Sequence, residues 1–226
     1  NHAAAIGALL AGCRHVFGYP ITPSTEGAEL LAKVLPRLGG TFLQAASEVA
    51  AVNMMYGCGG AGLPAMTFTS SPGFSLMLEG ISYMIGSQLP GVFVDVMRAG
   101  PGLGNVGPAQ ADIKLACRGL GHGDTHAIVL APATPQEMLD FTMLAFELSF
   151  RYRNPVVVLA DGASSQTVAR EHARTAGAEV SHVYGHALRG YAARFTPAGL
   201  AAVRSDARVR YVTPDAEVRL AAQVLP

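Results

Sequence analysis

A carboxylate in a segment of small residues is the group best suited to chemistry in this chain. Glu48 stands within residues 45–51, whose other members are alanine, serine and valine. Such a segment favours close packing, and a carboxylate is rarely buried without a partner. One interpretation is that Glu48 meets a ring nitrogen of a bound cofactor and shares a proton with it. A solvated helix carboxylate beside Ser47 fits the sequence equally well.

A rigid loop precedes the next predicted helix. In residues 18–26, GYPITPSTE, two prolines surround Thr22. Prolines stiffen a turn and force extended conformations on the residues before them. Ser24 or Thr25 can cap the following helix and leave amide hydrogens near an anionic ligand. An ordinary helix cap with a proline turn explains the same residues.

Two further positions follow predicted strands. The turn at residues 70–75, SSPGFS, contains Ser71 and Pro72, and its small residues allow a ligand or a neighbouring chain to approach the backbone. Arg98 lies just past the carboxyl end of a predicted strand, where open α/β sheets place ligand contacts. A guanidinium can hold a carboxylate with two hydrogen bonds. The plainer alternative is a solvated arginine at a strand end.

Two glycine runs match the dinucleotide spacing G-x-G-x-x-G. The run at 57–62 follows a predicted helix, so it fails as a fingerprint. The run at 102–107 follows a strand, but residues 97–101 intervene where an immediate tight turn is needed. A Rossmann-type nucleotide binder therefore remains an alternative, with NAD binding sensitive to Gly104→Val as its signature.

Helical and strand patterns alternate along the first 162 residues. This rhythm predicts an α/β domain with a mostly parallel sheet. The predicted helices cover residues 3–11, 26–34, 45–55, 74–85, 109–117 and 135–150, and the predicted strands cover 65–69, 91–96, 128–131 and 155–159.

The composition changes beyond Gly162, where lysine disappears and arginine and alanine recur. The change predicts a boundary between a domain at 1–162 and a small tail at 163–226. The tail pattern predicts a helix at 165–176, strands at 179–184, 190–195 and 209–212, and a helix beginning at Thr196-Pro197. With 155–159 as its first strand, the tail would form an α+β, ferredoxin-like β-α-β-β-α-β unit.

Composition and charge exclude several classes of partner. The 226 residues have a formal net charge of zero and 14% charged residues, so no overall field favours nucleic acid or a membrane surface. No apolar run is long enough to cross a membrane, and no secretory signal is recognisable, which predicts a cytoplasmic protein.

The sequence predicts no metal site on this chain. The three cysteines form no C-x-x-C, so any iron–sulfur cluster must lie on another chain. Two histidine pairs have metal-like spacing but no third ligand nearby. They are His122 with His126 and His182 with His186.

Several motifs in one order resemble the alpha subunit of 2-oxoacid:ferredoxin oxidoreductases. They lie at residues 18–24, 44–51, 69–77, 96–98, 121–124 and 152–161. The resemblance covers roughly the first 162 residues and is nearest to the branched-chain (2-oxoisovalerate) type, with its Met-Arg-x-Gly-Pro-Gly-Leu-Gly-Asn run. It implies a thiamine-diphosphate-binding-type three-layer α/β/α fold, serving as the pyrimidine-binding domain.

The resemblance also implies site roles. The family oxidises a 2-oxoacid, transfers the acyl group to coenzyme A and reduces ferredoxin, using thiamine diphosphate. Glu48 would be the catalytic glutamate that hydrogen-bonds the aminopyrimidine. Thr22, Ser71 and Pro72 would bind the cofactor with it, and Thr22 and Arg98 would contact the substrate.

The same resemblance implies partners. Nothing here matches the Gly-Asp-Gly then Asn pattern that binds the diphosphate and Mg²⁺, so both are expected on a beta subunit. Iron–sulfur clusters would lie on ferredoxin-type or gamma subunits of a hetero-oligomer, and the isolated chain would be inactive. Two departures are Ala46, where relatives often have a second acidic residue, and the start at Asn1, inside the usual Gly-Asn opening, which predicts a missing first strand.

The tail has a resemblance of its own. Residues 168–222, especially 182–193 and 209–215, resemble the propeptide or inhibitor domain of subtilisin-type proteases. A protease-binding module is therefore a second functional alternative. Such propeptides begin with a strand like 155–160, so two domains share the same strand. The larger core is expected to keep it, because burial in a doubly covered sheet stabilises more.

Overall fold

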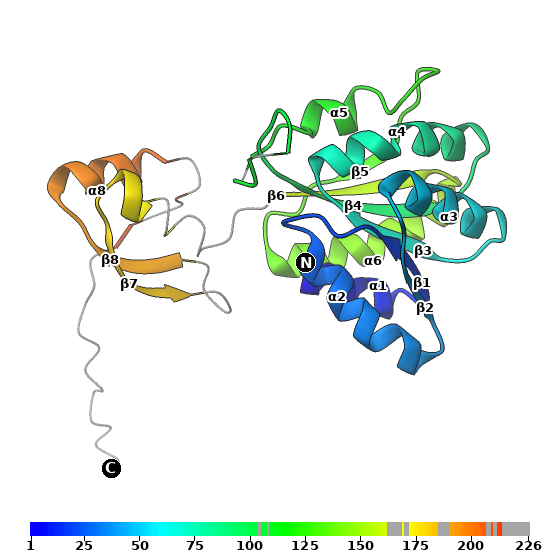
Figure 1. The fold of residues 1–226 in the computed structure, drawn as a ribbon, viewed down its shortest axis with the longest axis horizontal. Coiled ribbons are helices and arrows are strands. Elements are labelled where there is room, and N and C mark those ends of the chain that lie inside the picture. The colour runs from blue at the N-terminus through cyan, green and yellow to red at the C-terminus, as the bar shows by residue number, and fades with distance from the viewer. Residues whose placement is uncertain are drawn as a thin grey trace, which may run out of the picture. The chain divides into compact units, whose positions relative to one another are not determined.

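The computed structural model describes residues 1–103, 105–107, 109–161, 169, 172–184, 190–206, 209 and 212–213. The chain divides into two compact units, Asn1–Gly162 and Ala163–Pro226. Figure 1 shows the helices and strands of each unit.

A six-stranded parallel sheet forms the centre of the first unit. Its strand order is β2-β1-β3-β4-β6-β5, and every neighbouring pair runs parallel. The predicted parallel α/β architecture is therefore confirmed. The strands are β1 (His15–Gly18), β2 (Thr41–Gln44), β3 (Ala65–Thr69), β4 (Gly91–Met97), β5 (Ile128–Leu130) and β6 (Pro155–Asp161).

Helices cover both faces of this sheet, which makes three layers. α1, α2 and α6 pack on one face, and α3, α4 and α5 pack on the other (Figure 1). The helices are α1 (His2–Leu10), α2 (Thr25–Val34), the 3-10 turn η1 (Leu35–Leu38), α3 (Glu48–Gly60), α4 (Ser71–Gly86), α5 (Ile113–Cys117) and α6 (Pro135–Tyr152).

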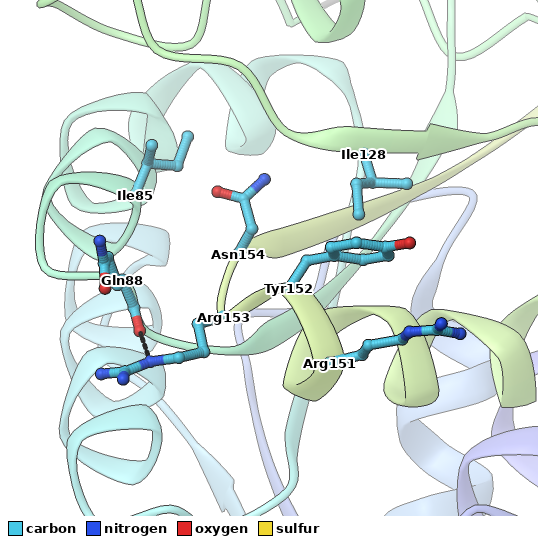
Figure 2. Close-up of a pocket in the computed structure, with 7 residues that line it drawn as sticks. All are labelled: Ile85, Gln88, Ile128, Arg151, Tyr152, Arg153 and Asn154. Carbon is cyan, nitrogen blue, oxygen red and sulfur yellow. Dashed lines mark hydrogen bonds between the residues drawn. The ribbon is translucent and has the colours of Figure 1, made fainter.

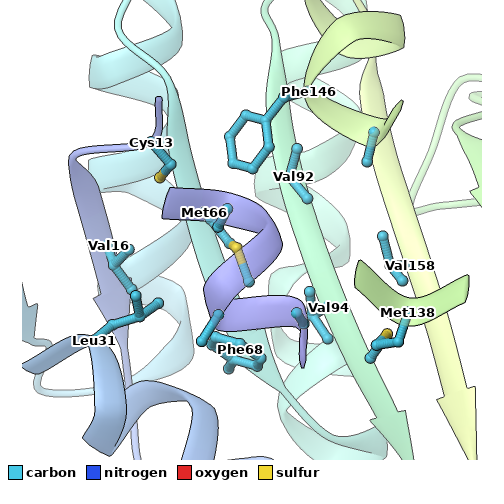
Figure 3. Close-up of a cluster of buried hydrophobic side chains, with 14 of the residues drawn as sticks. Cys13, Val16, Leu31, Met66, Phe68, Val92, Val94, Met138, Phe146 and Val158 are labelled. Carbon is cyan, nitrogen blue, oxygen red and sulfur yellow. The ribbon is translucent and has the colours of Figure 1, made fainter. Parts of the chain in front are cut away.

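Two hydrophobic cores follow from the alternation of side chains along each strand. On β4, Val92 and Val94 enter the core beneath α1, α2 and α6, part of which Figure 3 shows. Phe93 and Met97 enter the opposite core, beneath α3, α4 and α5. By the same alternation Asp95 points toward the second core, where an ionisable side chain is unexpected.

Several predicted boundaries were wrong, for local reasons. The helix predicted over 45–55 begins at Glu48, because Ser47 is extended and its Oγ accepts the Ala50 N–H at 3.3 Å. The helix predicted from residue 109 begins at Ile113. The strands β1 and β2 were not predicted. Each has four residues, too short to establish an alternating pattern.

The second unit contains a hairpin and a helix. β7 (Glu179–Tyr184) pairs antiparallel with β8 (Gly190–Arg194), and α8 (Pro197–Arg204) begins where Thr196 Oγ1 accepts the Gly199 N–H at 3.1 Å. Residues 172–175 are helical. Residues 210–211 of the strand predicted at 209–212, and residues 165–168 and 170–171 of the helix predicted at 165–176, lie outside the described residues.

The strand claimed by both resemblances belongs to the large sheet. β6 pairs with β4 along its whole length and with β5 on its other side. Its residues Val156, Val157 and Val158 are fully buried. Burial of such side chains contributes roughly 1.5–3 kcal/mol each, which gives the strand its place in this core.

None of the helices in the described part of the chain is both long enough and apolar enough to cross a membrane.

Candidate functional site

Glu48 is buried at the amino end of α3. Its side chain is 5% exposed, so the solvated alternative is wrong. As the first residue of the helix, it lies where the helix dipole and free amide hydrogens favour a carboxylate. The sequence suggested a mid-helix carboxylate, whereas the structure shows one at a helix start.

A cavity of about 410 Å³ connects Glu48 to three other predicted site residues. It lies at the carboxyl ends of the parallel strands, where open α/β proteins bind their ligands. Thr22, Pro72 and Arg98 line it together with Glu48, whereas Ser71 does not. The complete lining is Tyr19, Pro20, Ile21, Thr22, Glu48, Pro72, Gly73, Leu76, Arg98 and Leu103.

Arg98 is a buried cation at the cavity wall. It is only 4% exposed, so the solvated alternative is wrong here too. Its Nη1 donates to the backbone oxygen of Thr22 at 2.8 Å, and its Nε has no hydrogen-bond partner. No carboxylate among the described residues forms an ion pair with it. A desolvated guanidinium with a free donor is suited to an anionic ligand.

Ser71 has a structural connection to the strand end that carries Arg98. The Ser71 Oγ accepts the backbone N–H of Arg98 at 2.9 Å and lies 3.1 Å from the backbone oxygen of Arg98. The same hydroxyl donates to the carboxylate of Asp112. These contacts occupy the hydroxyl that the sequence assigned to cofactor binding.

Several buried polar atoms of β3, of the residue after it and of Arg98 have no hydrogen-bond partner. The hydroxyls of Thr67, Thr69 and Ser70 are buried without a hydrogen-bond partner, as is the Arg98 Nε. Buried polar groups in proteins are nearly always paired with protein, water or ligand. Of these residues Arg98 lines the cavity, and the Thr69 hydroxyl lies beside Gly73 and Glu48, so a donor, a hydroxyl and a carboxylate are available to a polar ligand.

Gly73 provides room for the Glu48 side chain. A Cβ at this position would come within 2.6 Å of Glu48 Oε1 and closer still to Thr69 Oγ1. Both oxygen atoms therefore border the space that a side chain at residue 73 would occupy. The tight fit explains why a glycine follows Pro72 in the turn.

Gly73→Ala is expected to destabilise the fold by about 1–3 kcal/mol and to displace Glu48, because the added methyl group overpacks the site. Thermal unfolding of the variant measures the loss. Gly57→Ala is the matched control, since Gly57 lies in α3 with open space around it, and it should stabilise slightly. Equal stability of Gly73→Ala and the wild type would contradict the packing account.

Asp95 is a buried acid beneath the site. It is fully buried, and neither of its carboxylate oxygens has a hydrogen-bond partner. Burial above all, with the nearby charge of Asp112, raises the pKa of Asp95 well above its usual range. An unfolded aspartate ionises near pH ~4. Between that value and the raised pKa, the folded chain holds one proton more than the unfolded chain.

Stability is therefore expected to fall as pH rises through this window, because the unfolded state binds fewer protons there. Asp95→Asn should remove the part of this decline in stability that Asp95 causes. Urea denaturation of the wild type and the variant over a pH series measures the slope of the free energy of unfolding against pH. The same slope in the variant would show that Asp95 is already ionised in the folded wild type.

Gly73, Thr69, Asp95 and Asp112 were not among the predicted site residues. Asp95 had a recognisable signal, since it is the only ionisable residue in the strand sequence GVFVDVM. Asp112 had none, because it lies just before the short helix α5 and reaches Ser71 only through the tertiary fold.

The glycine run at 102–107 departs from a dinucleotide fingerprint. Gly104 and Pro108 lie outside the described residues. Among the described ones, Gly102 has a positive φ of 82°, but α5 begins only at Ile113. The pyrophosphate of a dinucleotide needs a helix amino end directly after the glycines.

A second cavity lies at the amino ends of the strands, at the opposite edge of the sheet. Its volume is about 620 Å³. Figure 2 shows that Arg151 and Arg153 point away from each other, and the Arg153 Nε donates to the Gln88 backbone oxygen at 3.5 Å. The two cations therefore do not converge on one ligand. The lining is Ile85, Gln88, Ile128, Arg151, Tyr152, Arg153 and Asn154.

Metal-binding residues do not cluster in the part of the chain that the structure describes, where no three of His, Cys, Asp and Glu side chains come together. Of the histidine pairs with metal-like spacing, His186 lies outside that part.

Fold and site together define a class of protein: a parallel α/β domain with a ligand cavity, a buried glutamate and a buried arginine at the carboxyl ends of its strands. The family model described as "Pyruvate flavodoxin/ferredoxin oxidoreductase, thiamine diP-bdg" matches residues 6–209. The chain belongs to this family of thiamine-diphosphate-binding domains.

Curated relatives share much of the sequence. The chain is 55% identical to the ketoisovalerate oxidoreductase subunit VorB of Methanothermobacter marburgensis over 166 residues, which are 74% of this chain and 47% of that protein. It is 47% identical to the 2-oxoglutarate synthase subunit KorA of Methanocaldococcus jannaschii over 161 residues, 71% of this chain and 44% of that protein. The chain thus spans about half the length of the curated relatives it matches.

A solved structure supports the fold. The 2-oxoglutarate:ferredoxin oxidoreductase from Magnetococcus marinus, with 2-oxoglutarate, coenzyme A and succinyl-CoA bound, superposes with a TM-score of 0.69 and 39% identity. The match covers 71% of this chain and 28% of that chain. These relatives favour the thiamine-diphosphate hypothesis over a nucleotide binder or a protease inhibitor.

The propeptide resemblance of the tail receives no support. The oxidoreductase family model continues to residue 209, across most of the segment that suggested a protease propeptide. The short sequence runs at 182–193 and 209–215 were a weak basis for assigning the segment to another family.

Proposed function

We propose that this chain provides the half of a thiamine-diphosphate site that holds the pyrimidine end, within a 2-oxoacid:ferredoxin oxidoreductase. The observation that carries the proposal is the buried Glu48 carboxylate in a cavity that it shares with Thr22, Pro72 and Arg98. The family match supplies the cofactor class. The domain limits 1–162 and 163–226 remain part of the proposal.

Glu48 is assigned to the ring nitrogen of the pyrimidine. A buried carboxylate that meets a ring nitrogen holds a proton between the two atoms and fixes the orientation of the ring. Thiamine diphosphate, when bound, provides the electron sink for loss of carbon dioxide from a 2-oxoacid. The chain's own task at this point is to orient the ring and hold that proton.

Arg98 and Thr22 are assigned to the substrate. The guanidinium would neutralise the 2-oxoacid carboxylate, and the Thr22 backbone oxygen fixes the guanidinium from the other side. A charge-assisted hydrogen bond in a water-poor cavity is stronger than one in water. Pro72 forms part of the wall, while Ser71 acts through its contacts with the Arg98 backbone.

The remaining components are assigned to other subunits. Glu48 is the one carboxylate among the residues that line this cavity, and it is assigned to the ring nitrogen. The lining therefore has no other carboxylate for Mg²⁺. We therefore place the diphosphate and its Mg²⁺ on a beta subunit, and the iron–sulfur clusters on ferredoxin-type or gamma subunits. Coenzyme A and ferredoxin would be the other reactants, and the cytoplasm is the expected compartment.

A branched-chain 2-oxoacid is the proposed substrate class. The support is the 55% identity to a subunit whose name specifies ketoisovalerate. Reconstitution tests it: the chain is added to the other subunits of the Methanothermobacter marburgensis enzyme in place of VorB. Reduction of ferredoxin with 2-oxoisovalerate, but more slowly with 2-oxoglutarate, is expected. A preference for 2-oxoglutarate would overturn the substrate assignment.

A further inference from the structure

Three aliphatic side chains of the Glu48 cavity are left without a role by the proposed function. They belong to the loop after β1, to α4 and to the loop after β4, and are Ile21, Leu76 and Leu103. Ile21 is half-buried beside Thr22, so the two leucines are the more accessible. Small-molecule sites combine apolar walls with a few placed polar groups, and the apolar wall contacts the uncharged part of the ligand.

Leu76 lines the cavity from the second turn of α4. It stands four residues after Pro72, so the two side chains lie on the same face of the helix, and both line the cavity. The core-facing side of α4 uses other residues, among them Met77 and Ile81. Leu76 itself is 53% exposed, so packing in the core does not account for it.

Leu103 reaches the cavity from the loop after β4. The Ala99 N–H donates to the Gly107 oxygen at 2.8 Å and joins the two ends of this loop. Gly102, immediately before the leucine, has a φ of 82°, a left-handed conformation that favours glycine. Leu103 is 79% exposed and still lines the same cavity as Arg98. The loop therefore presents this side chain to a ligand rather than to the core.

The charges of the cavity match a ligand with one carboxylate. Among the described residues that line it, Arg98 is the one cation and Glu48 the one anion. Arg98 is assigned to the carboxylate that every 2-oxoacid carries. A second carboxylate on the same ligand would lie beside leucines, in a cavity that already holds an anion. A charge that leaves water without a partner is strongly disfavoured.

An uncharged aliphatic side chain suits the same wall. Each methylene group of a substrate that enters an apolar pocket contributes roughly tenfold to discrimination. Leucine provides this contact without adding a polar group that would itself need a partner. The lining therefore favours a 2-oxoacid with an aliphatic side chain over one with a second carboxylate.

We propose that Leu76 and Leu103 are specificity-determining residues, which contact the aliphatic side chain of a monocarboxylic 2-oxoacid and exclude a second carboxylate. The proposal rests on the function proposed above, because it takes Arg98 as the contact of the first carboxylate. It deepens that function by assigning the choice between 2-oxoacids to two residues of this chain, one on α4 and one on the loop after β4.

Truncation of the two leucines tests the aliphatic contact in the assembled enzyme. Leu76→Ala and Leu103→Ala should each lower kcat/KM for 2-oxoisovalerate roughly tenfold. The kcat/KM for pyruvate should change little, because pyruvate has only a methyl group to place against this wall. Leu38→Ala is the matched control, since Leu38 is 50% exposed in η1, which packs on the other face of the sheet.

A cation at residue 103 tests the exclusion of the second carboxylate. Leu103→Lys should raise kcat/KM for 2-oxoglutarate about tenfold and lower that for 2-oxoisovalerate about tenfold, because the ammonium group pairs with the second carboxylate and replaces an apolar contact. Leu103→Gln is the neutral control, which should lose activity with 2-oxoisovalerate without the gain for 2-oxoglutarate. A gain of activity cannot arise from a loss of folding or assembly.

The possible failures are distinguishable. An assembly that turns over no 2-oxoacid would refute the proposed function and the specificity role together. A wild type that prefers 2-oxoisovalerate, with the same preference in Leu76→Ala, Leu103→Ala and Leu103→Lys, would overturn the specificity role alone. Loss of assembly in the alanine variants, measured by size-exclusion chromatography, would assign the leucines to a subunit contact and would also overturn the specificity role.

Discussion

Glu48→Gln is expected to lower the turnover of the assembled oxidoreductase by roughly 10²–10⁴-fold, the usual contribution of a positioned acid–base group. Glutamine fills the same space at the start of α3 and keeps a hydrogen-bonding oxygen, but it cannot hold the proton of the ring nitrogen. The fold should remain intact, since the substitution keeps the volume of the side chain.

Steady-state ferredoxin reduction measures this effect, with thermal unfolding as the check on folding. Glu147→Gln is the matched control, because Glu147 is an exposed carboxylate on α6, which packs on the opposite face of the sheet. Its turnover should equal that of the wild type. A Glu48→Gln enzyme with unimpaired turnover would mean that another group performs the assigned role.

Arg98→Met is expected to raise the KM for the 2-oxoacid about 100-fold, the scale measured when one partner of a buried charge pair is removed. Methionine keeps much of the volume of the arginine stem but neither the charge nor the donors. Affinity for thiamine diphosphate should change little, because the assigned contact is with the substrate carboxylate.

Arg98→Lys separates charge from geometry. Lysine keeps the charge but loses the planar fork, so its KM should fall between those of the wild type and Arg98→Met. Arg37→Met, an exposed arginine in η1, serves as the control. If Arg98→Met lost more affinity for thiamine diphosphate than for the substrate, Arg98 would contact the cofactor rather than the substrate.

The sequence predicted much of the fold because strong patterns coincide with long elements. The buried strands β4 and β6 are apolar runs apart from Asp95 and the terminal Asp161. α6 begins at a Thr-Pro-Gln-Glu start in which the Thr134 Oγ1 accepts the Glu137 N–H at 3.1 Å. The four-residue strands β1 and β2 were not predicted, because their pairing depends on the register with neighbouring strands.

The candidate site was predicted in part for the same reason. Thr22, Glu48, Pro72 and Arg98 carry local signals, namely a proline turn, an isolated carboxylate, a strand-to-helix turn and a strand end. The contact of Ser71 with Asp112 joins residues 41 positions apart, and no local pattern encodes it. Burial of Arg98 likewise depends on the Thr22 loop, which only the folded chain brings near.

Calorimetry of thiamine diphosphate with Mg²⁺ tests the central claim most directly. The titration is made into the full chain alone, into the beta subunit alone and into the two combined. Binding that is strongest in the mixture and is lost with Glu48→Gln, but not with Glu147→Gln, is the predicted result. Equal binding to the beta subunit with and without this chain would contradict a shared cofactor site.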